Sequence, residues 1–284
     1  MISIVIPLYN KQDCICKTID SVLGQKGVDD FELVVVDDGS TDESCQLVSG
    51  YSDGRIHLYK KENGGPASAR NYGVERSQGE WVLFLDADDC LEVDALSFLT
   101  QKAIEYPNLS CFSANHFCSL GNVRKVCSRW MPNGIIRYPF MLWFFGVFMP
   151  RAGAAMFSRT MLLGYPHDAH LRRYEDAGML FDIMRNERFY NSSKPIMCYN
   201  QDTLAASKGR EDISEDYIGH LDITGKSIWE RFVLYDLYCQ GLRLYPRQMS
   251  QLYSNGVVRK SDVIPYKAVC LLRLSMRIIN KILR

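Results

Sequence analysis

Three carboxylates stand directly after a short apolar run in this chain. Asp86, Asp88 and Asp89 follow Trp81 to Leu85 in the stretch GEWVLFLDADDC. Like charges about 4 Å apart repel by roughly 4 kcal/mol at an effective dielectric constant near 20, so such a cluster is unfavourable unless a cation or strong donors lie among the carboxylates. Carboxylate oxygens are ligands that Mg²⁺ and Mn²⁺ prefer. The cluster therefore predicts either a divalent-cation site or a solvated acidic turn that caps the next helix.

A second acidic pair could handle a proton. The segment RRYEDAGM places Glu175 and Asp176 at a predicted helix start. A carboxylate beside a reacting hydroxyl can serve as a general base. Acidic residues in a first helical turn are also favourable simply because they face the positive end of the helix dipole. The pair by itself leaves both interpretations open.

The elements that must position these residues repeat one pattern four times in residues 1 to about 106. An apolar strand is followed by a turn-rich loop and then by a helical stretch. The predicted strands are 2–6, 31–36, 55–60 and 81–85, and helices follow at 11–23, after Ser40, after Pro66 and at 93–106. Ser40 and Glu43 have the spacing of a capping box, and Pro66 suits a first helical position. This alternation predicts a mostly parallel α/β sheet with helices on both faces.

In open sheets of this kind, ligands bind at the carboxyl ends of the strands. The loops at those ends carry these polar residues and glycines: Tyr9 and Asn10; Asp37 and Asp38; Asn63, Gly64 and Gly65; Asp86 and Asp88. We therefore expect the four loops to converge on one crevice. No G-x-G-x-x-G follows any of the first strands, so a nicotinamide-dependent enzyme is disfavoured.

Beyond residue 106 the pattern loosens. Strands are predicted at 109–117, 123–126 and 153–157, a helix at 175–185, and mostly polar helical sequence from about 206 onward. The apolar segment Phe140 to Met149 is shorter than the about 20 residues that span a bilayer. It predicts a buried or partner-facing helix, and a homodimer is among the expected partners.

Composition bears on partners and compartment. The chain has 33 basic and 33 acidic residues, so no nucleic-acid partner is indicated. Its ten cysteines include no C-x-x-C pair, and no basic leader precedes the first strand. We therefore expect reduced thiols and a cytoplasmic location. His116, His167 and His170 lack a metal-binding spacing and are expected in loops or on the surface.

Five motifs in order resemble one known family. IVIPLYN, VVVDDGSTDES, NGGPASARNYG, GEWVLFLDADD and YEDAGM make the chain similar to a family 2 glycosyltransferase of the GT-A fold. The resemblance is strong over residues 1–95, moderate to about 205 and absent in the tail. It implies a catalytic domain at 1–205, with a nucleotide-sugar-binding half at 1–106 and an acceptor-side half at 107–205. A C-terminal helical extension would cover 206–284.

The resemblance also implies roles for single residues. Asp176 would be the catalytic base, with Glu175 orienting the acceptor or the base. Asp88 would bind Mn²⁺ or Mg²⁺, and Asp86 would contact the donor ribose or the metal through water. The other substrate-binding residues implied are Pro7, Tyr9, Asn10, Asp38, Gly65, Arg70 and Ala87.

Plainer alternatives stand beside these roles. Tyr9 can be a packed loop aromatic, Asp38 an ordinary turn residue, and Arg70 a structural partner of an aspartate. Asp89 can cap the next helix. In YNQDTLAASKGR, Lys208 and Arg210 fall where the family closes over the diphosphate, but this segment departs most from the family pattern.

The implied activity is metal-dependent, inverting transfer of a sugar from a nucleotide-diphosphate sugar, with a UDP-sugar favoured. The acceptor would be a hydroxyl of a saccharide or lipid-linked glycan in cell-surface polysaccharide synthesis. Two alternatives are a nucleotidyltransferase that makes the sugar nucleotide and a non-catalytic module that binds a nucleotide sugar or glycan. The first would need a glycine- and arginine-rich phosphate loop after the first strand, which is missing.

The tail at residues 263–284 has five basic residues and no acidic ones. From Arg273 onward its basic residues fall on one helical face, with apolar residues roughly opposite. Such a helix can lie on an anionic membrane, which would make the protein peripheral on the inner face of the cell membrane. The alternative is a terminal helix that packs on the catalytic domain.

Overall fold

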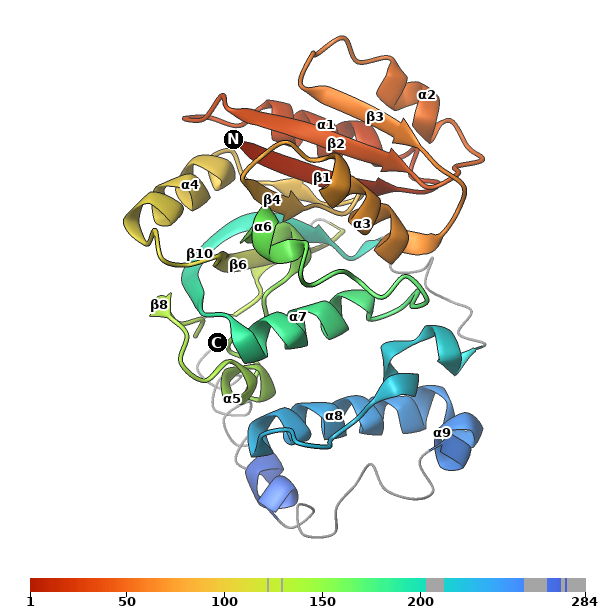
Figure 1. The fold of residues 1–284 in the computed structure, drawn as a ribbon, viewed down its shortest axis with the longest axis vertical. Helices are drawn as coiled ribbons and strands as arrows, with labels where there is room; N and C mark the ends of the chain where they lie inside the picture. The colour runs from red at the N-terminus through yellow and green to blue at the C-terminus, as the bar shows by residue number, and fades with distance from the viewer. Residues whose placement is uncertain (122, 129, 203–211, 253–264, 272–273, 275–284) are drawn as a thin grey trace.

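The computed structural model describes the chain except residues 122, 129, 203–211, 253–264, 272–273 and 275–284 (Figure 1). One mixed sheet lies at its centre. The strands are β1 (Ile2–Leu8), β2 (Phe31–Asp37), β3 (Ile56–Lys60), β4 (Trp81–Phe84), β5 (Cys90–Leu91), β6 (Cys111–Leu120), β7 (Val123–Val126), β8 (Gly134–Ile135), β9 (Ala155–Ser158) and β10 (Phe189–Asn200). The helices are α1 (Ile15–Leu23), α2 (Ser44–Ser49), α3 (Gly65–Arg76), α4 (Ala95–Glu105), α5 (Pro139–Phe144), α6 (Arg159–Leu162), α7 (Glu175–Asn186), α8 (Ile228–Leu244) and α9 (Pro246–Leu252).

The sheet order is β3-β2-β1-β4-β9-β6-β10-β5, with β7 paired to β6 and β8 to β10. Strands β3, β2, β1, β4, β6 and β10 share one direction, and β9 runs against both of its neighbours. The predicted mostly parallel α/β sheet is confirmed. Because β1 lies between β2 and β4, the loops that follow these three strands meet at one edge.

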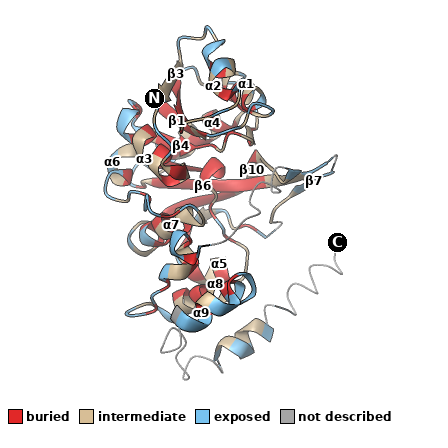
Figure 2. Ribbon diagram, turned by 90° about the vertical axis from the view of Figure 1, so that its right-hand side faces the viewer, coloured by how far each residue is buried: buried red, intermediate tan, exposed pale blue. Residues whose placement is uncertain are grey.

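Successive side chains along each strand point to opposite faces of the sheet, so a separate hydrophobic core forms on each face. On β1, Ile4 and Ile6 pack with the apolar sides of α1 and α4, while Val5 belongs to the core that contains α3 and α7. All three side chains are fully buried. Figure 2 shows the buried strands between layers of helices whose outer sides are exposed.

Close contact between β1 and its flanking segments depends on small residues. A Cβ atom at Gly73 in α3 would lie 2.3 Å from Cγ1 of Val5, and one at Gly79 would lie 2.6 Å from Oγ of Ser3. The Ser3 hydroxyl accepts a hydrogen bond from the Gly79 amide and donates to Glu32. These glycines let α3 and the turn before β4 lie close against β1.

Three local predictions need correction. The capping box at Ser40 and Glu43 is wrong, because α2 begins at Ser44 and no side chain caps it. The Ser40 hydroxyl instead accepts a hydrogen bond from the Asn10 amide. Strands β5, β8 and β10 were not predicted, and the apolar segment at 140–149 forms only the short helix α5. Phe140, Phe144 and Phe148 of that segment are buried within the chain.

The C-terminal helices pack below α7 (Figure 1). Phe144 of α5 contacts Phe232 of α8 with ring centroids 5.6 Å apart, and Arg185 of α7 donates to Glu230 at 2.6 Å. Within the described ranges, no helix has both the length and the apolar composition needed to cross a bilayer. The predicted division at residue 205 falls in 203–211, outside the described residues.

The first part of the predicted tail helix packs on this extension. The Tyr266 hydroxyl donates to Asp236 at 2.8 Å, and its ring contacts Phe144 and Phe232. This contact agrees with the packing alternative for residues 265–271. Arg273, Arg277, Lys281 and Arg284 lie outside the described residues, so membrane binding by the tail stays a prediction.

Candidate active site

A cleft of about 470 Å³ opens at the carboxyl ends of β1, β2 and β4. Of the residues predicted from sequence, those that line it are Pro7, Tyr9, Asp38, Gly65, Arg70, Asp86, Ala87 and Asp88. The parallel strands bring these side chains together from four separate loops, as expected. Asn10, Glu175 and Asp176 are not part of the cleft wall, although Glu175 accepts a hydrogen bond from Arg70, which is.

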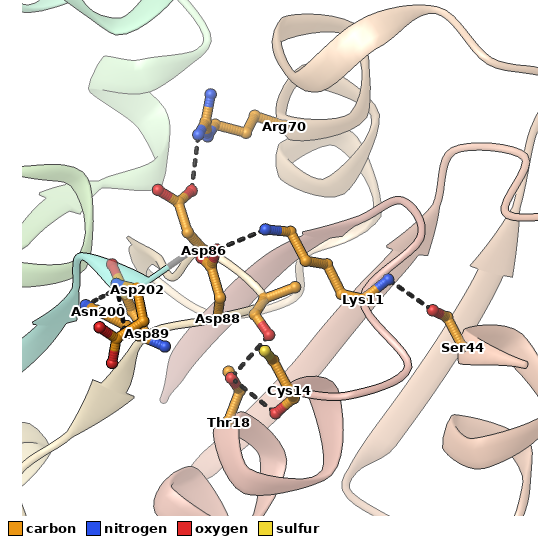
Figure 3. Close-up of polar contacts among 11 residues, drawn as sticks. Lys11, Cys14, Thr18, Ser44, Arg70, Asp86, Asp88, Asp89, Asn200 and Asp202 are labelled. Atoms are coloured by element: carbon orange, nitrogen blue, oxygen red, sulfur yellow. Dashed lines mark hydrogen bonds and ion pairs between the residues drawn. The ribbon is translucent and has the colours of Figure 1, made fainter. Parts of the chain in front are cut away.

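Asp88 is held by a cation of the chain itself. The Lys11 ammonium lies 2.5 Å from Oδ2 of Asp88 (Figure 3), and these side chains are 28% and 13% exposed. Lys11 directly follows the PLYN segment, and its amide donates to Ser44 at 2.8 Å. The ammonium therefore relieves repulsion in the acidic cluster, and sequence analysis missed this residue.

Arg70 bridges the two halves of the predicted catalytic domain. Its two terminal nitrogens donate to Asp86, after β4, and to Glu175, at the start of α7, each at 2.7 Å. The Arg70 side chain is 6% exposed, and its Nε has no hydrogen-bond partner among the described residues. The predicted pairing of Arg70 with an aspartate is confirmed, and Glu175 is a second partner.

The charge of Arg70 affects the pKa values of both carboxyls that it contacts. Burial disfavours the ionised form of Asp86, but the charge of Arg70 outweighs it and lowers the pKa of this carboxyl. Burial raises the pKa of Glu175, with help from the neighbouring charge of Asp176, although Arg70 opposes the change. The two carboxyls that share one guanidinium thus shift in opposite directions, because Arg151 and Lys11 add positive charge near Asp86 whereas Asp176 adds negative charge beside Glu175.

Asp38 and Asn10 hold the loops of the cleft. The Asp38 carboxylate accepts hydrogen bonds from the amides of Gly64 and Gly65, at 3.0 and 2.7 Å, and from Lys61 at 2.6 Å. Asn10, at a left-handed φ of 50°, bonds through its side chain to Thr41. Both residues therefore fix loop geometry, and their contacts with a nucleoside stay predictions.

Asp89 does not cap the next helix. Helix α4 begins at Ala95, whereas Asp89 is 1% exposed and accepts a hydrogen bond from the Asn200 amide at 2.9 Å. Burial, followed by the charge of Asp86, raises the pKa of Asp89 to about 8. The helix-cap interpretation is wrong, and Asp89 instead ties the acidic turn to the end of β10, as Figure 3 shows.

Asp176 lies in the first turn of α7, half-buried beside Glu175. No described residue donates a hydrogen bond to its carboxylate. Its charge interacts with both Arg70 and Glu175. The residue before the pair, Tyr174, has φ 50° and ψ 27°. A non-glycine residue in this region costs about 1–3 kcal/mol, and such strain is typical of functional sites.

Besides Lys11, three polar residues of the cleft wall were missed. Arg151, Arg172 and Tyr199 line it, and the Arg151 guanidinium lies 3.5 Å from the centre of the Tyr199 ring. Arg172 donates to Asn63 and packs against Gly65, where a Cβ would lie 3.4 Å from it. Only Arg172 had a nearby signal, since it stands just before the YED motif. Together with Lys11 and Arg70, these arginines make the cleft suitable for an anion.

The histidine prediction is wrong for His116, which lies in strand β6, whereas His167 and His170 lie in the loop before α7 as expected. His116 and His167 are 2% and 4% exposed, while His170 is exposed. Burial lowers the pKa of His167 to about 3 and that of His116 to about 4, with Arg70 and Arg151 adding to the respective shifts. His167 packs edge-on against Phe84, below the acidic turn. Lys208 and Arg210 lie outside the described residues.

A sheet with a hydrophobic core on each face and a carboxylate-lined cleft at its parallel strand ends are features of the open α/β class of proteins. Residues 3–164 match the family described as Glycosyl transferase family 2. The chain belongs to this family.

Two relatives illustrate how far the sequence similarity extends. Over 107 residues the chain is 38% identical to Glycosyltransferase GlyA of Streptococcus pneumoniae serotype 4, which covers 37% of this chain and 15% of that protein. Over 109 residues it is 41% identical to the putative teichuronic acid biosynthesis glycosyltransferase TuaG of Bacillus subtilis, covering 37% of this chain and 41% of that protein. The chain thus spans less than half the length of both relatives.

Similarity of structure extends further along the chain. The crystal structure of S. aureus TarS 1–349 in complex with UDP-GlcNAc superposes with a TM-score of 0.65 at 20% sequence identity. The superposition covers 88% of this chain and 77% of that one. The predicted GT-A fold is confirmed by this likeness.

Proposed function

We propose that this protein transfers a sugar from a nucleotide-diphosphate sugar, with a UDP-sugar favoured, to a hydroxyl of a saccharide or lipid-linked glycan. The transfer inverts the anomeric centre. Membership of glycosyltransferase family 2 supports the reaction class. The TarS crystal structures contain UDP and UDP-GlcNAc, which supports the donor class.

The observation that carries this proposal is the Arg70 bridge. It joins Asp86 in the cleft to Glu175 at the start of α7, with each bond 2.7 Å long. The predicted metal-binding turn and the helix start that carries the predicted base are thus joined by one rigid guanidinium. Such rigid positioning is what a displacement between a bound donor and a separate acceptor requires.

The cleft fits the predicted Mn²⁺ or Mg²⁺. Asp86 and Asp88 each use one carboxylate oxygen for a basic side chain, and no described residue donates to the other oxygen. Hard oxygen ligands of this kind suit both ions. When bound there, the ion would neutralise charge that develops on the diphosphate leaving group.

The chain's own residues carry the remaining steps. The acceptor oxygen forms a bond to the anomeric carbon while the bond from that carbon to the diphosphate oxygen breaks. Asp176 takes the proton of the acceptor hydroxyl, and Glu175, fixed by Arg70, orients the acceptor or the base. Arg151 and Arg172, which face the cleft, offer forked donors to phosphate oxygens.

The setting of the reaction follows from the relatives. TuaG is named for teichuronic acid synthesis, and a succinoglycan biosynthesis protein, ExoO of Rhizobium meliloti, is 39% identical over 103 residues, covering 36% of this chain and 29% of that protein. We propose a related part in the synthesis of a cell-surface polysaccharide, carried out at the cytoplasmic face of the membrane. The acceptor is then a growing glycan or its lipid-linked form.

The test is hydrolysis and transfer with a panel of UDP-sugars in the presence of Mn²⁺. We expect slow donor hydrolysis by the full chain and its loss in Asp88→Ala. Asp94→Ala, at a half-buried carboxylate just before α4 and outside the cleft, is the matched control and should stay active. Thermal shifts with nucleoside diphosphates, with and without Mn²⁺, report donor binding separately. Tight binding without turnover under any acceptor would instead support a binding module.

A further inference from the structure

Three side chains that bind soft metals gather on the hairpin formed by β6 and β7. The ring nitrogens of His116 and the sulfurs of Cys118 and Cys127 bring their ligand atoms within 4.8 Å of one another. His116 and Cys118 lie in β6, and Cys127 directly follows β7. Figure 2 shows this hairpin extending from the body of the sheet.

The ladder of the hairpin explains why these residues meet. His116 and Cys118 are two positions apart in one strand, so their side chains share a face. Phe117 pairs with Val126, which sets Cys127 opposite His116, and the Cys127 amide donates to the His116 carbonyl at 2.8 Å. Directly opposed residues also share a face. The pleat therefore holds all three ligands on one side of the hairpin.

His116 supplies an independent observation. Only 2% of the residue is exposed, and neither ring nitrogen has a hydrogen-bond partner among the described residues. A buried polar group without a partner costs about 1–3 kcal/mol, and nearly all such groups in folded proteins are satisfied. A ligand bound to the ring would remove this cost on one side of the imidazole.

We propose that His116, Cys118 and Cys127 bind one Zn²⁺ ion. One imidazole and two thiolates match the donor preference of zinc, whereas Mg²⁺ and Mn²⁺ prefer oxygen. Zinc–sulfur bonds of about 2.3 Å in a tetrahedron put two sulfurs about 3.8 Å apart, so ligand atoms within 4.8 Å need to move by only about 1 Å. Water or an external thiol fills the fourth position.

The site lies beside one wall of the cleft. Arg151, which lines the cleft, is close enough to both His116 and Cys127 to interact with them electrostatically. Cys118 pairs in the sheet with Tyr199, the residue on which Arg151 stacks. The bound ion cross-links β6 to the residue after β7 and thereby holds the hairpin beside this wall of the cleft.

The test measures zinc bound by the reduced full-length protein. Zinc affinity is obtained by competition with a chromogenic chelator, and Co²⁺ substitution reports thiolate ligation through a charge-transfer band in the near ultraviolet. The ligand variant is Cys118→Ser with Cys127→Ser. Its matched control is Cys45→Ser with Cys239→Ser, which removes two thiols on α2 and α8 that lie outside the cluster.

We expect one zinc per chain in the native and control proteins, with an affinity at least about 100-fold higher than that of the ligand variant. The same affinity should persist in Asp88→Ala, which separates this site from the proposed donor site. Equal affinity in the ligand and control variants would overturn the proposal. So would a protein whose Cys118 and Cys127 form a disulfide and bind no zinc after reduction.

Discussion

Replacing Arg70 by Met should destabilise the fold because it leaves a buried carboxylate without its cation. Arg70 and Glu175 are only 6% and 12% exposed, and breaking a buried pair by removing one partner costs about 3–5 kcal/mol. The Asp86 side chain is 37% exposed, so water screens its interaction with Arg70. We therefore include no stability cost for the loss of that second ion pair. At about 2–4 °C per kcal/mol, the melting temperature should fall by about 6–20 °C.

Thermal or urea unfolding at pH 7.5 checks this value. Arg76→Met is the matched control, because Arg76 is exposed on the same helix and stacks on Tyr72 with a 4.3 Å separation from the ring centre. Its cost should stay below about 1 kcal/mol. Adding Glu175→Gln to Arg70→Met should recover part of the loss, because it removes the buried charge. If Arg70→Met costs no more than Arg76→Met, or if the two costs in the double variant simply add, the bridge does not carry the stability argued here.

Three further outcomes are expected. Asp176→Asn should lower kcat by about 10²- to 10⁴-fold in a transfer assay and leave the thermal shift produced by UDP unchanged. A loss of UDP binding as large as the loss of rate would contradict the role of Asp176 as general base. Lys11→Met should tighten Mn²⁺ binding roughly fivefold in a paramagnetic-resonance titration, because the partly exposed ion pair between Lys11 and Asp88 is worth about 1 kcal/mol. Unchanged affinity would mean that Lys11 does not compete with the ion. Asp89 has a folded-state pKa of about 8, raised above its unfolded value, so its contribution to stability is complete below about pH 4 and is lost as pH rises toward 8. Relative to Asp89→Asn, which keeps an acceptor for the Asn200 amide, the native protein should lose up to about 1.4 kcal/mol per pH unit in that range, and parallel stability profiles would refute the shift.

The sequence alone determined the repeating strands and helices of the first 106 residues. Their apolar runs and turn residues act locally, so the strand Trp81–Phe84 and the helix that starts near Pro66 lie where they were predicted. The convergence of Asp38, Asp86 and Asp88 on one cleft also followed, because carboxyl ends of parallel strands share an edge. The family resemblance supplied the roles, which local patterns leave open.

Only the tertiary structure decided the partners of those residues. Lys11 and Asp88 are 77 positions apart, and Arg70 and Glu175 are 105 apart, so no local spacing signals either pair. Strand β10 was missed because its residues follow a helix without the periodicity of an isolated strand, and it is stabilised by pairing with β6. The burial of His116 has the same origin. Charge, strain and ligand geometry depend on contacts between distant segments, and these exist only once the sheet has formed.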